Sequence, residues 1–192
     1  QTIYFSQSCK DYTFIENLYK FILVKKNSFI FESVEKGKIR GRYTIIGFNP
    51  DKIWNINKNS IDFFFKGRKR KIKAKPLNFL NSLLSKFNTK IPKGLPNMAS
   101  MLVGYFSYDV IRYVEQIPDK CIDDLKLPDV RLSRPKSLII YDNLKKEIYY
   151  IENIFSDTPI KNYFEEYQLI KNNFDLFQQY EKIGLPEKFT FK

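Results

Sequence analysis

The sequence predicts an α+β fold in which largely antiparallel sheets pack against a few helices. Apolar residues switch along the chain between a period of two, typical of strands, and a period of 3.6, typical of helices. Neighbouring strand-like segments are joined by short turns, which suit antiparallel hairpins. With 192 residues, of which 43% are hydrophobic, the chain can bury one sizeable core, and its length favours one domain over two.

The first half of the chain is expected to begin with a strand at "TIYFS". A helix capped by Thr13 follows, and its apolar side consists of Phe14, Leu18, Phe21 and Ile22. Next come two antiparallel hairpins. The first joins 29–35 to 42–48 and closes around Gly37 and Gly41, and the second joins 51–57 to 60–67 through Lys58 and Asn59.

The second half is expected to alternate helices with strands. Pro76 begins a helix with Leu77, Leu80, Leu84 and Phe87 on one side. Then follow a central strand at 101–108, a short helix at 109–115 capped by Asp109, a long ordered loop at 116–135, and a hairpin at 137–153 that turns at 143–146. A last helix begins at Thr158 and Pro159, ends near Gly184 and Pro186, and buries Tyr163, Phe164, Tyr167, Ile170, Phe174 and Phe177.

The chain ends suggest a piece of a longer polypeptide. The chain begins at Gln1 rather than Met, and alternation resumes at Phe189 and Phe191 as though another strand were starting. No secretory signal or membrane-spanning run is visible. With Cys9 and Cys121 as the only cysteines and no histidine, neither a disulfide framework nor a zinc site is implied, and we expect a cytoplasmic protein.

The formal net charge of +12 raises the question of nucleic-acid binding. The one dense basic run is 67–75, and its alternation continues that of the Phe-rich strand before it. We interpret this run as the solvated return arm of a hairpin, because abundant Lys, Asn, Ile and Phe together indicate a compositional bias and because no base-reading platform is visible.

Catalytic chemistry is hard to find in this chain. No general base of the usual kind is present, no Ser or Cys has an activating partner, and there is no Gly-rich phosphate loop. The acidic group Asp119, Asp123, Asp124 and Asp129 matches no cation-binding spacing, so we favour a surface loop over a metal site. Arg112 and Glu115, three residues apart, are expected to form a structural ion pair.

Polar residues interrupt the first hairpin. Glu32 and Ser33 lie within an apolar strand, and Arg42 and Thr44 lie on its partner strand. A buried carboxylate needs a partner or a ligand. Two explanations remain open, a structural pair between Glu32 and Arg42 across the hairpin, or a binding site at the strand edge.

Three ordered motifs resemble the N-terminal domain of anthranilate synthase component I, a chorismate-utilising enzyme family. They are "FESVEKGKIRGRYTIIGFNPDKIW", "VGYFSYDVIRYVEQIPDKCIDDLKLPD" and "SLIIYDN". In that family a Leu-Leu-Glu-Ser element is followed by ten residues and then by Ser. In this chain Ile30 and Phe31 take the Leu positions and Thr44 takes the place of the final Ser.

The resemblance implies that residues 1–192 are the regulatory half of a two-domain enzyme. The whole enzyme converts chorismate and ammonia to anthranilate and pyruvate, and L-tryptophan inhibits it by binding at this element. The expected tryptophan-binding residues are Phe31, Glu32, Ser33, Arg42, Tyr43 and Thr44, with Ile45 flanking the indole. Magnesium and the catalytic residues belong to the C-terminal domain, and a glutamine amidotransferase subunit supplies ammonia.

Related enzymes leave other assignments open. Aminodeoxychorismate synthase, which can hold tryptophan as a fixed structural ligand, and the isochorismate or salicylate synthases share the architecture. The "GRYT" segment beside the Glu-Ser element favours the anthranilate enzyme. The alternative from a different class is a basic RNA-binding module centred on 67–75.

Overall fold

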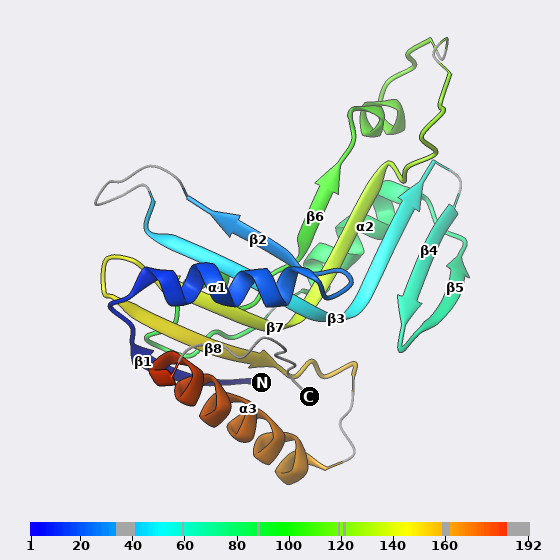
Figure 1. Ribbon diagram of the computed structural model, residues 1–192. Helices are drawn as coiled ribbons and strands as arrows, with labels where there is room; N and C mark the ends of the chain where they lie inside the picture. Colours follow the sequence, from blue (N-terminus) through cyan, green and yellow to red (C-terminus); the bar gives the residue numbers. More distant parts are fainter. Residues whose placement is uncertain are drawn as a thin grey trace. The chain divides into compact units, whose positions relative to one another are not determined.

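The computed structural model describes residues 1–33, 41–58, 60–87, 89–118, 120, 122–158 and 162–183. Hydrogen-bonded strands follow one another in the order β1-β8-β7-β3-β4-β5, while β2 pairs with β3 and β6 pairs with β7. The strands are β1 Thr2–Ser8, β2 Phe29–Glu32, β3 Tyr43–Asn57, β4 Ser60–Phe65, β5 Arg68–Ile72, β6 Val103–Phe106, β7 Val130–Asp142 and β8 Glu147–Asn153. The helices are α1 Tyr12–Leu23, α2 Pro76–Lys86 and α3 Tyr163–Ile183, with short 3₁₀ turns at Asn97–Ala99 (η1) and Tyr108–Tyr113 (η2) (Figure 1). These antiparallel strands and few helices confirm the predicted α+β class.

Contacts divide the chain into two compact units. Unit 1 consists of Gln1–Pro50, Ile91–Ser100 and Pro135–Lys192, and unit 2 consists of Asp51–Lys90 and Met101–Arg134. Both β3 and β7 contribute residues to each unit. The units are described separately below.

Unit 1 has a core between its strands and the helices α1 and α3. The core side chains come from β1, α1, β3, β7, β8 and α3 and include Ile3, Phe14, Ile15, Leu18, Ile22, Ile46, Phe48, Ile139, Tyr141, Ile148, Tyr150, Ile170 and Phe174. Burying a side chain of this size stabilises a fold by about 1.5–3 kcal/mol, so this cluster is the main support of the unit. In Figure 1, α1 is drawn in blue and α3 in orange and red.

The α1 helix begins two residues earlier than predicted. Asp11 is the N-cap, and its carboxylate accepts hydrogen bonds from the backbone N–H and the hydroxyl of Thr13, at 2.9 and 2.7 Å. The prediction of Thr13 as the cap is therefore wrong, because its hydroxyl donates to the true cap. Phe14, Leu18 and Ile22 are buried as predicted, while the side chain of Phe21 lies outside the described residues.

The two predicted hairpins of the first half are confirmed. Phe29 pairs with Gly47 and Glu32 with Thr44 in the first, and Asn57 pairs with Ser60 in the second. Gly37 and Asn59 lie outside the described residues. The segments 42–48 and 51–57 belong to one strand, β3, which passes through Asn49 at a φ of 49°.

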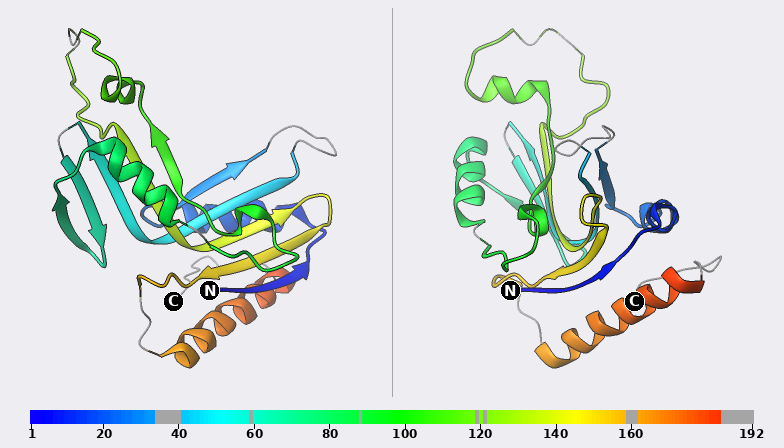
Figure 2. Two further views of the ribbon diagram at one scale, coloured as in Figure 1. Left: turned by 180° about the vertical axis from the view of Figure 1, so that it is seen from behind. Right: turned by 90° about the vertical axis from the view of Figure 1, so that its left-hand side faces the viewer.

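Unit 2 packs α2 on one face of the β3–β4–β5 hairpins. Its core contains Trp54, Ile56, Ile61, Leu80, Val130 and Leu132. The predicted return arm is strand β5, which pairs antiparallel with β4 at the end of the strand order (Figure 2). Helix α2 begins at Pro76 as predicted, but Leu84 is 54% exposed rather than on the buried side.

Three predictions for the middle of the chain are wrong. The segment 101–108 is not a central strand, because β6 pairs with β7 and only its first residue, Val103, is buried. The turn η2 is a 3₁₀ helix whose N-cap is Ser107, and Asp109 lies inside its first turn. The predicted loop 116–135 ends earlier, since residues from Val130 onward form β7.

The hairpin at 137–153 is confirmed, with β7 and β8 joined by a turn at 143–146. Helix α3 buries Ile170 and Phe174 as predicted, whereas Tyr163 is 50% and Phe164 67% exposed. The side chain of Phe177 and the residues Pro159, Gly184, Pro186, Phe189 and Phe191 lie outside the described residues. Within the described part of the chain, no helix is long and apolar enough to cross a membrane.

Candidate functional site

The predicted site residues lie where β2 ends beside the start of β3, in unit 1. The register places Phe31 opposite Ile45 and Glu32 opposite Thr44. Side chains alternate along a strand, so Phe31 and Ile45 share one face and Glu32 and Thr44 share the other. Since β2 ends at Glu32, this alternation does not fix the direction of Ser33.

A tyrosine from α1 ties the Glu32 face together. The hydroxyl of Tyr12 donates to Glu32 Oε1 and lies 3.1 Å from the Thr44 hydroxyl. Because the single Tyr12 proton goes to the carboxylate, Thr44 is the donor in the second bond. Burial, and then the bond to Glu32, raise the pKa of Tyr12 to about 12, so the phenol stays neutral at physiological pH. The Glu32 side chain is exposed, and one of its carboxylate oxygens is fixed by this bond.

Ser33 joins the two ends of the segment between β2 and β3. Its Oγ accepts a hydrogen bond of 2.8 Å from the backbone N–H of Gly41. Gly41 has a φ of 83°, in the left-handed region that glycine adopts at no steric cost. The hydroxyl hydrogen of Ser33 can therefore still be donated to another group.

Arg42 is bound to a different strand from the one predicted. Its Nε and Nη2 donate to the carboxylate of Asp142 at the end of β7, with the shortest contact at 2.7 Å. The guanidinium also lies 4.8 Å from the ring centre of Tyr43, at cation–π distance. The alternative of a Glu32–Arg42 pair across the hairpin is therefore wrong, because each residue has another partner.

Electrostatics keep the Arg42–Asp142 pair ionised. Burial opposes ionisation of Asp142, but the guanidinium and the backbone N–H groups of Lys145 and Leu144 outweigh it and lower the pKa of this carboxyl. The hydrogen bond from Arg42 to Asp142 raises the pKa of the guanidinium in turn. Burial raises the pKa of Tyr43, so that its ring carries no charge beside the pair.

A pocket of about 290 Å³ lies beside this ion pair. Arg42, Tyr43, Asp142 and Lys145 line one part of it, and the segment Gly94–Met98 lines the rest. This segment is not among the predicted site residues, and no sequence signal marks it.

The structure thus gathers the predicted residues into two groups. Glu32 and Thr44 meet at Tyr12, and Arg42 and Tyr43 meet at Asp142. Of the large apolar members, Ile45 is buried, whereas the Phe31 ring is 49% exposed and packs against Phe29 at 5.0 Å between ring centres. The half-exposed Phe31 ring and the fixed Glu32 carboxylate lie on opposite faces of β2, where the strand ends, and this strand end is the candidate binding surface.

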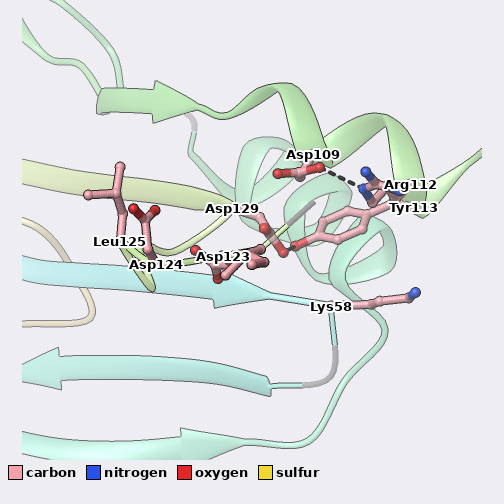
Figure 3. Close-up of a pocket in the computed structure, with 9 residues that line it drawn as sticks. Lys58, Asp109, Arg112, Tyr113, Asp123, Asp124, Leu125 and Asp129 are labelled. Atoms are coloured by element: carbon pink, nitrogen blue, oxygen red, sulfur yellow. Dashed lines mark hydrogen bonds and ion pairs between the residues drawn. The ribbon is translucent and has the colours of Figure 1, made fainter. Parts of the chain in front are cut away.

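A second pocket, of about 300 Å³, lies in unit 2 and is lined by the predicted acidic loop (Figure 3). Arg112 donates to Asp109 Oδ1 at 2.6 Å, so the predicted pair with Glu115 is wrong. Tyr113 donates to Asp129 at 2.7 Å, and Asp123 accepts the backbone N–H of Lys126 at 2.9 Å. Several of the carboxylates therefore hold the loop in shape.

Within the residues that the structure describes, no three His, Cys, Asp or Glu side chains lie close enough together to hold a metal ion. Asp119, the first member of the predicted acidic group, lies outside the described residues, as does Cys121.

Comparison with known proteins finds anthranilate synthases among the relatives of this chain. No protein-family model matches the chain. Over 131 residues the chain is 36% identical to anthranilate synthase component 1 of Cereibacter sphaeroides, covering 65% of this chain and 26% of that protein. Over 127 residues it is 35% identical to the component 1 of Acetivibrio thermocellus, covering 66% and 26%. Over 171 residues it is 30% identical to the chloroplastic anthranilate synthase alpha subunit 1 of Oryza sativa subsp. indica, covering 83% and 30%.

The fold has a counterpart among solved structures. The crystal structure of anthranilate synthase component I from Streptococcus pneumoniae TIGR4 superposes with a TM-score of 0.56 at 18% sequence identity, over 94% of this chain and 37% of that one. This likeness concerns the fold. The chain spans about a quarter of the length of the first two curated relatives.

Proposed function

The chain is homologous to the N-terminal domain of anthranilate synthase component I, and from this premise we propose that it is the regulatory, tryptophan-binding part of such an enzyme. The whole protein converts chorismate and ammonia to anthranilate and pyruvate. Its magnesium ion and catalytic groups belong to a C-terminal domain, and a glutamine amidotransferase subunit delivers the ammonia. The related chorismate enzymes are less favoured, because the relatives described above are all anthranilate synthases.

Free L-tryptophan is a zwitterion with a large ring, so its site needs an acceptor for the ammonium, a donor for the carboxylate and an apolar surface. The observation that carries the proposal is the combination found at the end of β2. Glu32 is an exposed acceptor held by Tyr12, and Ser33 can donate its hydroxyl hydrogen while its oxygen is held by Gly41.

Aromatic side chains next to these groups supply the apolar surface. Phe31 is 49% exposed and shares a strand face with Ile45, and Tyr43, two residues before Ile45, shares the same face. Tyr43 also lines the pocket formed with Gly94–Met98. We assign the indole ring to this surface.

The energy of binding requires both kinds of contact. Burying an indole of about 200 Å² at about 25 cal/mol per Å² contributes on the order of 5 kcal/mol, whereas micromolar affinity needs about 8 kcal/mol. Hydrogen bonds to the charged groups of the ligand, at about 1.5–3 kcal/mol each, account for the difference. Loss of one of these bonds is therefore enough to weaken inhibition severely.

Arg42 has a supporting role in this assignment. Its guanidinium is engaged by Asp142 and lies over the Tyr43 ring, so it fixes the ring that flanks the indole. Thr44 acts in the same way, because its hydroxyl donates to Tyr12 and so orients the phenol that holds Glu32.

Inhibition from a separate site requires tryptophan to bind one arrangement of the enzyme more tightly than the other. Moving such an equilibrium almost completely takes about 5.5 kcal/mol of differential affinity. The test therefore uses the full-length protein.

The proposal is tested with Ser33→Leu in the full-length protein, assayed for anthranilate formation with an ammonium salt as the nitrogen source. We expect turnover of chorismate to be retained and inhibition by L-tryptophan to be lost, because leucine removes the hydroxyl donor and puts a larger apolar side chain in its place. Ser85→Leu, at an exposed serine on α2, is the matched control and should stay sensitive. A Ser33→Leu enzyme that remains fully inhibited would remove the basis of the site assignment.

A further inference from the structure

The basic segment of unit 2 is more concentrated than the composition of the chain explains. Seven of the ten residues from 66 to 75 are Lys or Arg, against 33 of 192 in the whole chain, and this stretch contains no acidic residue. It also holds two of the seven arginines of the chain. A compositional bias toward lysine does not predict arginines here. Arginine is the residue that can bind a phosphate through two hydrogen bonds from one guanidinium.

The sheet register puts arginines and aromatic rings on one face. Arg70 pairs with Phe63 and Arg68 with Phe65, so these four side chains emerge on the same side of the β4–β5 hairpin. The rings of Phe63 and Phe65 lie nearly parallel, with an interplanar angle of 7° and centres 6.2 Å apart. On this face Phe63 stacks on Trp54, with ring centres 6.0 Å apart, and packs against the core cluster that contains Leu80 of α2. Among the described side chains packed on that cluster, Phe63 is included and Phe65 is not.

Lysine side chains are already fixed beside these rings. Lys52 Nζ lies 5.8 Å from the ring centre of Phe63 and 5.5 Å from that of Phe65, and Lys66 Nζ lies 5.4 Å from that of Phe65. A side chain held in place before binding loses less conformational entropy when it meets an anion. The rings and cations together form what we call the hairpin patch, defined as Lys52, Phe63, Phe65, Lys66, Arg68 and Arg70.

The arginines of the patch are exposed and do not neutralise a carboxylate of the protein. In the described part of the chain, the acid nearest this strand pair is Asp62, and it pairs with Lys69 on the opposite face at 2.8 Å. No described carboxylate forms an ion pair with Arg68 or Arg70. One or two charges on an edge strand are enough to prevent it from pairing with a strand of another chain, and this role needs no stacked rings beside the charges.

We propose that the hairpin patch binds single-stranded nucleic acid. Phosphates meet the lysine and arginine groups, and bases stack on the Phe65 ring, which the core-packed Phe63 ring supports; this is the combination that sequence-independent single-strand sites use. The platform that the sequence did not reveal is supplied by the register of β4 against β5. An acidic polypeptide or an anionic membrane would match the charge but would make no use of the parallel rings.

The test measures binding of a fluorescent 20-nucleotide oligouridylate to the full-length protein by anisotropy, between about 50 and 200 mM salt. The double variant Arg68→Gln, Arg70→Gln removes two phosphate contacts, so the slope of log Kd against log salt should fall by about 1.4 and affinity by at least about tenfold. The matched control Lys10→Gln, Lys26→Gln removes the same charge from exposed sites of unit 1 and should change Kd less than about twofold.

The rings are tested separately. Phe65→Ala should weaken binding by about tenfold and Phe65→Trp should restore it, whereas Phe106→Ala, at an exposed aromatic of β6, should have no effect. Thermal unfolding of each variant checks that the fold is intact. Equal losses of oligouridylate affinity in the arginine and lysine double variants would overturn the proposal. It would also be overturned if Phe65→Ala had no effect and poly-glutamate or phosphatidylserine vesicles displaced the oligouridylate at the same charge concentration. None of these outcomes depends on the tryptophan site.

Discussion

The Arg42–Asp142 pair allows a quantitative prediction about the support of the candidate site. Asp142 is 1% exposed and sits at the end of β7, where it accepts hydrogen bonds from the guanidinium and from the backbone N–H groups of Leu144 and Lys145 at 3.1 and 3.2 Å. Asp142→Ala removes every one of these acceptors. Asp142→Asn keeps the oxygen that the two N–H groups and Arg42 Nε share, and loses the charge.

The loss of stability expected from these substitutions depends on how exposed the hydrogen-bond partners of Asp142 are. Removing one member of a fully buried ion pair costs about 3–5 kcal/mol. Leu144 and Lys145 lie in an exposed turn, and the Arg42 side chain is 32% exposed, so water can replace part of what Asp142 provides. We therefore expect Asp142→Ala to lower the free energy of unfolding by about 2–3 kcal/mol and Asp142→Asn by about 1 kcal/mol.

Urea unfolding at pH 7 measures both variants, with Asp124→Asn at an exposed loop position as a control that should change stability by less than about 0.5 kcal/mol. The lowered pKa of Asp142 gives the pH dependence its sign. Its stabilisation is present above the ordinary value of 3.8 and is lost as the pH falls through the lower folded value, so the gap between wild type and Asp142→Ala should close in acid. An alanine variant as stable as wild type, or an asparagine variant as damaging as alanine, would refute the reasoning.

Two further predictions concern the sheet. Burial raises the pKa of Glu152 despite hydrogen bonds from Ser137 and Tyr150. The stability of the wild type should therefore fall relative to that of Glu152→Gln as pH rises above 4.5, by about 1.4 kcal/mol per pH unit up to the folded pKa. Urea unfolding of both proteins from pH 4 to 8 measures this, and a stability difference that stays constant with pH would contradict it. Gly104→Ala should destabilise the chain by several kcal/mol or displace β6, because its Cβ would lie 1.8 Å from the backbone oxygen of Arg131. Gly67→Ala, where the added Cβ meets no atom and only the left-handed φ of 74° is unfavourable, should cost about 1 kcal/mol. Thermal unfolding that finds Gly67→Ala the more damaging change would count against the close approach at Gly104.

Local patterns account for what the sequence predicted correctly. The hairpin at 137–153 has continuous apolar runs on both sides of a polar turn, and strand-like segments at 51–57 and 60–67 likewise flank a short polar turn. In each of these the pairing partners are close in the chain, so register follows from the turn. The α1 cap failed because Asp11 and Thr13 are both good capping residues and only the backbone geometry chooses between them.

Contacts between distant segments account for what the sequence missed. Val130–Pro135 was predicted as loop together with the Pro- and Asp-rich residues before it, but the segment belongs to β7. Arg131 donates to Asn55 and Arg134 to Asp51, which gives both cations a partner inside unit 2. These partners lie 76 and 83 residues away.

The candidate site shows the same division. The hairpin that holds Glu32 and Thr44 was predicted, whereas the contact of Glu32 with Tyr12 and that of Arg42 with Asp142 join segments 20 and 100 residues apart. Only the fold shows that Tyr12 and Asp142 orient these residues.

The most direct measurement is the position of L-tryptophan in crystals of the full-length protein grown with the amino acid. We expect the ammonium within hydrogen-bonding distance of Glu32, the carboxylate accepting from Ser33, and the indole against Phe31 and Tyr43. Tryptophan bound at another place, with Glu32 and Ser33 bonded only to Tyr12 and Gly41 as they are here, would contradict it.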